Sequence, residues 1–184
     1  MYWFKLRSKF MFFLPVIILL MVIVSCKNDR NSAVDTKKFF DIKGYFHADS
    51  ARLSKLNPSI TKTVAHNNDS ETKKVQVPNW VTELSLFSES DINKPAWRDS
   101  YAVQTSENTI IYLAKDSSLR TRRIIINKTG DRVKWILIIN YTKNFLYESS
   151  EKLSYFPDSL YLIQKKQSVR ILGTDRYTIS GAFR

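Results

Sequence analysis

The segment VKWILIINY at residues 133–141 decides the fold of this chain. Its odd positions are apolar throughout, which is the period-two pattern of a β-strand. We therefore expect one apolar face made of Val133, Trp135, Leu137, Ile139 and Tyr141. Ile136 and Ile138 are apolar as well, and the run Ile124-Ile125-Ile126 repeats this feature. An antiparallel sheet with one solvent-exposed face should alternate cleanly, so these central strands are expected to be covered on both faces.

Strand-like segments continue on both sides of this one. They cover residues 101–105, 109–115, 121–127, 145–155, 160–166, 169–172 and 177–183. The separators between them are short and rich in Ser, Asn, Asp, Gly and Pro, which are turn residues. Links of this length join antiparallel neighbours and are too short for the crossovers that parallel strands need.

Two helices and a hairpin are expected before these strands. Apolar residues at helical spacing predict a helix over residues 37–56, with Asp35 or Thr36 as its cap. Residues 60–66 and 72–77 form a predicted hairpin around Asn67-Asn68-Asp69. A second helix is expected from Trp80 to Ile92, capped by Asn79 and closed by Pro95. The fold class is thus α+β: helix, hairpin, second helix, then a long antiparallel β-meander that forms a curled sheet or half-barrel.

The sequence allows two alternatives for the space that the predicted sheet encloses. The helices can cover one face, and on the other the sheet must curl on itself or enclose something. A small barrel commonly fills with side chains, so a packed core and a ligand cavity are both admissible. In either case we expect Trp135 to face an enclosed apolar interior.

Positive charge is the second feature of the chain. It has 29 Lys and Arg against 17 Asp and Glu, a formal net charge of +12. Basic residues crowd three consecutive predicted strands and aromatic residues follow them, which in a cytoplasmic protein would suggest nucleic acid. The candidate residues for binding a ligand or partner are Arg120, Arg122, Arg123, Lys134, Trp135, Leu137 and Tyr141. The alternative is that these charges serve solubility and cross-strand pairing.

The sequence nominates no catalytic residue. It has no Gly-rich phosphate loop, H-E-x-x-H, C-x-x-C or G-x-S-x-G motif. His47 and His66 lie on a predicted helix and near a predicted hairpin tip, so a shared metal site would need a long-range coincidence. We expect no cofactor, no metal and no enzymatic activity.

The first 26 residues supply an address. Lys5, Arg7 and Lys9 precede an apolar run over residues 10–24, which is the pattern of a secretory signal. The run ends in Ile23-Val24-Ser25-Cys26, which resembles a bacterial lipoprotein signal peptide with its lipobox. By that resemblance Cys26 would be acylated and become the new N-terminus, and two or more acyl chains anchor a protein stably. The alternative is an uncleaved signal anchor, although 15 apolar residues fall short of the roughly 20 that span a bilayer.

The expected domains follow from this resemblance: residues 1–25 as signal peptide, 26–36 as lipidated cysteine and flexible tether, and 37–184 as a single α+β domain. Removing residues 1–25 leaves 159 residues with a formal net charge of +9. The implied location is a Gram-negative cell envelope, on the outer membrane facing the periplasm. The segment Lys27-Asn28-Asp29 is weakly similar to signals that send lipoproteins to the cell surface, so surface display is the alternative. Export disfavours nucleic acid as a partner, and the expected partners of the basic residues are anionic lipid headgroups or an envelope protein.

Three functions are weighed. The first is non-catalytic binding of a lipid or other amphiphile, because the predicted layout resembles the half-barrel-with-helical-lid proteins that carry or receive lipoproteins. That resemblance is architectural, and no characterised family is matched residue by residue outside the lipobox. The second is a structural or interaction lipoprotein that docks an envelope protein. The third, an envelope hydrolase, has the least support. A cavity lined by Trp135, Leu137 and Tyr141 would favour the first, and a filled core with an exposed apolar patch would favour the second.

Overall fold

The computed structural model describes residues 37–183. The predicted signal peptide, Cys26 and the tether therefore lie outside the described residues.

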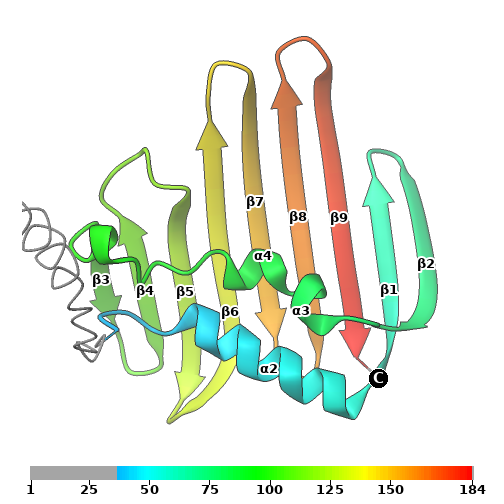
Figure 1. The fold of residues 1–184 in the computed structure, drawn as a ribbon, viewed down its shortest axis with the longest axis horizontal. Coiled ribbons are helices and arrows are strands. Elements are labelled where there is room, and N and C mark those ends of the chain that lie inside the picture. The colour runs from blue at the N-terminus through cyan, green and yellow to red at the C-terminus, as the bar shows by residue number, and fades with distance from the viewer. Residues whose placement is uncertain (1–36, 184) are drawn as a thin grey trace, which may run out of the picture. The chain divides into compact units, whose positions relative to one another are not determined.

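The described residues form one open antiparallel sheet of nine strands with short helices beside it (Figure 1). The strand order is β2-β1-β9-β8-β7-β6-β5-β4-β3. From β3 to β9 each strand pairs with the next along the chain, and the hairpin of β1 and β2 joins the sheet through β9. The strands are β1 Ser59–His66, β2 Asp69–Gln76, β3 Tyr101–Thr105, β4 Thr109–Ala114, β5 Thr121–Thr129, β6 Arg132–Lys143, β7 Tyr147–Phe156, β8 Leu160–Val169 and β9 Gly173–Phe183.

This topology confirms the predicted antiparallel meander. The sequence analysis predicted one strand more than the described residues contain. Of residues 169–172, expected as a strand, Val169 ends β8 and residues 170–172 are the turn between β8 and β9. Ile171 and Leu172 there are 92% and 83% exposed, so their apolar character does not reflect burial in the sheet.

The helices are shorter than the sequence predicts. Helix α2 covers Ile42–Leu56 and begins at Asp41, whose carboxylate accepts a hydrogen bond from the Gly44 amide at 2.8 Å. The second predicted helix is broken into α3 Trp80–Glu83 and α4 Ser85–Ser88, followed by a 3₁₀ turn, η1 Pro95–Trp97. Asn79 caps α3 as predicted. The hydroxyls of Ser88 and Ser90 bond backbone carbonyls three and four residues back, which competes with helix continuation.

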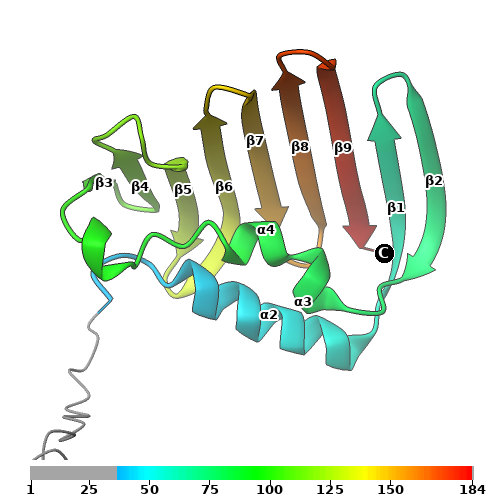
Figure 2. The ribbon, with the colours of Figure 1, turned by 45° about the horizontal axis from the view of Figure 1, so that its top comes forward.

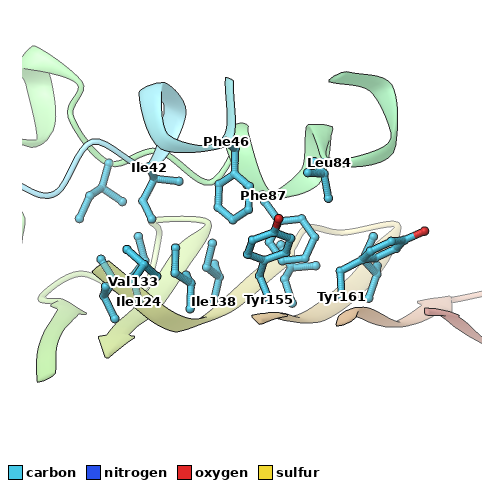
Figure 3. Packing of buried hydrophobic residues seen from close by; sticks show 14 of the residues in the cluster. Ile42, Phe46, Leu84, Phe87, Ile124, Val133, Ile138, Tyr155 and Tyr161 are labelled. Carbon is cyan, nitrogen blue, oxygen red and sulfur yellow. The ribbon is translucent and has the colours of Figure 1, made fainter. Parts of the chain in front are cut away.

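The helices of residues 37–183 all lie on one face of the sheet, as Figure 2 shows. The space between the two layers is filled by aromatic and aliphatic side chains, and Phe46, Phe87 and Tyr155 meet there at ring-centroid distances of 4.9–5.7 Å (Figure 3). At the other end of the interface Trp80 stacks on Phe183. This packing favours the filled-core alternative over an enclosed cavity.

Two tyrosines of the sheet are hydrogen-bonded to the helices. The Tyr155 hydroxyl donates to the Asp49 carboxylate, and the Tyr161 hydroxyl donates to Glu83. Burial raises the pKa of both tyrosines, and their carboxylate partners raise it further. Among the described residues the hydrophobic core runs from Phe39 to Phe183, and residues 37–184 form one compact unit. A compact unit with its own hydrophobic core meets the condition for a domain that folds alone.

The prediction that Trp135 faces an enclosed interior is wrong. Ile136 and Ile138 are fully buried under the helices, so Trp135 and Leu137, which alternate with them, lie on the opposite face. Val133 is buried with the isoleucines because a β-bulge interrupts the alternation: Lys128 pairs with Val133 and Asn127 with Trp135, which leaves Lys134 unpaired. The expected cover on both faces is not found within residues 37–183, whose helices cover one face only.

No helix in residues 37–183 is long and apolar enough to cross a membrane.

Candidate binding surface on the open sheet face

The face of the sheet turned away from the helices, here called the open face, carries an apolar strip across its middle strands. Cross-strand pairing aligns Ile111, Ile125 and Leu137 in one row, and Leu113 and Ile139 lie in the next row. The strip consists of Ile111, Leu113, Ile125, Trp135, Leu137, Ile139, Tyr141 and Leu162. Each of these side chains is partly buried by its neighbours on the same face. The strip is therefore an apolar surface that no described element covers.

A basic depression adjoins this strip over β7, β8 and β9. It has a volume of about 320 Å³ and is lined by Ile139, Ser150, Glu151, Lys152, Gln164, Lys165, Lys166, Arg176, Tyr177 and Thr178. The side chains of Lys152, Lys166 and Arg176 are on the open face, because their cross-strand rows continue from Ile139 and Tyr141. Within residues 37–183 no carboxylate forms an ion pair with these three cations. Their charge is thus available to an anionic partner.

The structure brings five of the seven predicted site residues to the open face. Arg122 lies over the Tyr141 ring, with 5.3 Å between the guanidinium carbon and the ring centroid. Arg123 pairs across the strands with Ile139 and is exposed. Trp135, Leu137 and Tyr141 form the middle of the strip. A cation and an aromatic ring in this arrangement attract one another, which orders the edge of the surface.

Arg120 and Lys134, the other two predicted residues, are placed differently. Arg120 is committed to the helix-covered face, where its guanidinium donates to the Glu151 carboxylate at 2.8 Å. Lys134 is exposed at the β-bulge, outside the regular alternation of β6. The four candidate cations Arg120, Arg122, Arg123 and Lys134 therefore do not lie on a single surface.

Glu151 belongs to a buried polar cluster under the helix layer. Its carboxylate accepts from Arg120 and from the Asn140 amide at 3.2 Å, and Lys165 lies 3.6 Å away. Asn140 also donates to the Ser90 hydroxyl at 2.9 Å, which ties β6 to the segment after α4. Because a buried carboxylate is costly unless paired, the cluster explains why Arg120 is withdrawn from the surface.

Catalytic or metal-binding clusters do not emerge among the described residues. His66 stacks on Tyr177 at 4.5 Å and bonds the Asp175 carboxylate at 3.1 Å, whereas His47 is exposed on α2. Residues 37–183 contain no group of three or more His, Cys, Asp or Glu side chains placed to hold a metal ion.

Lys152, Lys166 and Arg176 were missed by the sequence analysis. They are far apart along the chain, and only the register of β7, β8 and β9 brings them together. The period-two alternation places Lys152 and Lys166 on one face of their own strands, but which face is open depends on where the helices pack.

Comparison with protein-family models, with curated proteins and with solved structures finds no match to this chain.

Proposed function

We propose that this chain is a non-catalytic lipoprotein of a bacterial envelope that docks an acidic protein partner on its open face. The observation that carries the proposal is the apolar strip beside three unpaired cations. Apolar area supplies affinity in such a contact, while complementary charge sets the encounter rate and selects the partner. The proposed class of partner is a protein whose docking surface is apolar at its centre and acidic at its edge.

Binding of a lipid or amphiphile is the second candidate. Its support is that the apolar strip lies next to the basic depression. This arrangement matches a molecule with an acyl chain and an anionic head. The filled space between helices and sheet argues against a deep acyl-chain cavity there. Ligand sites commonly bury most of a small ligand, and the open face is a broad surface, which suits a protein better. The curled sheet or half-barrel layout does not require an enclosed ligand.

The anchor is tested through Cys26. We expect the membrane form to carry acyl chains on residue 26 and to have lost residues 1–25, because the lipobox resemblance implies acylation before cleavage. Cys26→Ala should leave an uncleaved and unacylated precursor. The measurement is the intact mass of both proteins purified from bacterial membranes. An unmodified mass for the parent chain would overturn the lipoprotein part of the proposal.

Docking is tested by charge reversal on the open face. A photo-crosslinking amino acid at Leu137 of the membrane-anchored chain should capture one discrete protein in intact cells. Lys152→Glu with Lys166→Glu should lower that yield by about tenfold or more, because close like charges at an interface cost several kcal/mol. The control is Lys43→Glu with Lys55→Glu, two exposed lysines of α2, which should leave the yield unchanged.

The outcomes separate the two candidates. Mass spectrometry should identify the captured protein as one with an acidic surface, and its purified form should bind the parent chain and not the Lys152/Lys166 variant. If capture at Leu137 yields a lipid adduct instead, and native mass spectrometry shows a lipid that is lost in Leu137→Ser, the amphiphile alternative replaces docking. Equal capture by both charge-reversal variants would overturn both candidates.

A further inference from the structure

Two neighbouring hairpin tips expose large apolar side chains. The turn between β6 and β7 presents Phe145, 79% exposed, and Leu146, 64% exposed. The turn between β8 and β9 presents Ile171 and Leu172, which are 92% and 83% exposed. Figure 1 shows these tips side by side at the end of the sheet that the helices leave uncovered. Of the large apolar side chains in residues 37–183, four of the five most exposed lie here, and the fifth is Leu56 of α2.

The tips are joined and held in shape. The Arg170 amide donates to the Leu146 carbonyl at 3.1 Å, and the Arg170 guanidinium carbon lies 5.0 Å from the centroid of the Phe145 ring. The Asn144 side-chain oxygen accepts from the amides of Leu146 and Tyr147, both at 2.9 Å. The apolar side chains are therefore presented by a backbone that its own hydrogen bonds fix.

Exposure to water does not explain why these turns carry apolar side chains. The exposed turn residues of the other hairpins in the described sheet are polar or glycine, as expected for water-facing turns, for example Asn67-Asn68 and Gly130-Asp131. Contiguous exposed apolar side chains mark a contact with a protein or a membrane. These four side chains are exposed at the tips of two hairpins, so they fit a medium that they can enter.

We propose that the paired tips, Phe145-Leu146 and Ile171-Leu172, insert into the interfacial region of a bilayer that contains anionic lipids. Phe, Leu and Ile are residues whose transfer from water to an apolar environment is favourable. Arg170 and Lys143 are next to them, and cations at that depth meet anionic headgroups. One carboxylate, Glu148, faces Lys143 at 3.6 Å. This inference concerns a second, peripheral membrane contact and does not depend on acylation of Cys26 or on the proposed docking partner.

The test uses residues 37–184, the compact unit that contains the core of the described residues and lacks Cys26. We expect this unit to co-float with vesicles of phosphatidylcholine and phosphatidylglycerol, and to bind vesicles of phosphatidylcholine alone more weakly. Phe145→Ser with Leu146→Ser should reduce partitioning to the mixed vesicles by at least about tenfold, because two of the four inserted side chains are lost. The matched control is Leu56→Ser with Val81→Ser, which removes two exposed apolar side chains of the helices, 63% and 55% exposed. Its partitioning should equal that of the parent.

A second variant reports insertion directly. Phe145→Trp should show a blue-shifted emission with mixed vesicles, and brominated lipids should quench the added fluorescence relative to the parent protein. Equal partitioning of the Phe145/Leu146 variant and the parent, or added fluorescence that brominated lipids leave unquenched, would overturn the proposal. So would an absence of vesicle binding by the parent. If the tips instead drive concentration-dependent self-association that the Phe145/Leu146 variant abolishes, they are a protein contact and the membrane assignment is wrong. Thermal unfolding and far-UV circular dichroism of each variant confirm that the fold is intact.

Discussion

Ile138→Ala is expected to lower the free energy of unfolding of residues 37–184 by about 2–5 kcal/mol, whereas Leu137→Ala should lower it by about 1 kcal/mol. The two residues are adjacent in β6 and lose aliphatic side chains of the same size. Ile138 is fully buried between Ile124 and Leu153 of the neighbouring strands and lies under the helices. Leu137 lies on the open face, where solvent replaces part of what its side chain contacts.

The measurement is urea-induced unfolding at neutral pH, followed by circular dichroism for the parent and both variants. A similar loss for both would indicate that the open face is covered in solution, by a second copy of the chain or by an element outside the described residues. A larger loss of unfolding free energy for Leu137→Ala than for Ile138→Ala would indicate that β6 faces the other way, with Leu137 in the core. That result would restore the sequence-based prediction that Trp135, Leu137 and Tyr141 point inward.

Strand positions could be predicted because period two and turn chemistry are local signals. Asn67 shows this for the first hairpin: the sequence predicted a turn around Asn67-Asn68-Asp69, and Asn67 adopts a φ of 53° in the observed turn, which is Asn67-Asn68. The facing of β6 could not be predicted, because both of its faces are apolar. Only packing against α2 selects Ile136 and Ile138 for the core, and the bulge at Lys134 moves Val133 out of phase with Trp135.

The predicted extent of the second helix was wrong for a different physical reason. Its apolar spacing suits a helix from Trp80 to Ile92, but the helix is interrupted at Leu84, between α3 and α4. Beyond α4 the hydroxyls of Ser88 and Ser90 bond backbone carbonyls, which competes with helix continuation. The candidate surface was predicted only in part, because some of its residues are neighbours in sequence and others are brought together by strand pairing. The residues of β5 and β6 could be grouped from one stretch of sequence, whereas Lys152, Lys166 and Arg176 needed the register of three strands.

The chain is expected to lose stability steeply in alkali, and Tyr101 supplies a measurable share of that loss. Its ring is 3% exposed and its hydroxyl donates to the Thr121 carbonyl at 2.9 Å. Burial raises the pKa of Tyr101 to about 12. Because the folded state binds this proton more tightly than the unfolded state, the stabilisation is complete below about pH 10, the ordinary tyrosine value, and is lost as the pH rises to about 12. A pKa that is higher by two in the folded state corresponds to about 3 kcal/mol of folding stability.

Tyr101→Phe isolates this contribution. At pH 8 the variant should be less stable than the parent by about 1 kcal/mol, because the Thr121 carbonyl loses its partner. Between pH 10 and 12 the order should reverse, because in the parent the Tyr101 phenol ionises in the unfolded state while burial keeps it protonated in the folded state. Ionisation stabilises the unfolded parent, so the free energy of unfolding falls faster for the parent than for Tyr101→Phe. Comparing the two proteins cancels the titration of their lysines and of the other buried tyrosines. Tyr147→Phe, at an exposed ring, is the control and should follow the parent. A constant difference between parent and Tyr101→Phe from pH 8 to 12 would show that the Tyr101 hydroxyl is open to water, and that the edge of the sheet at β3 is less closely packed than the structure has it.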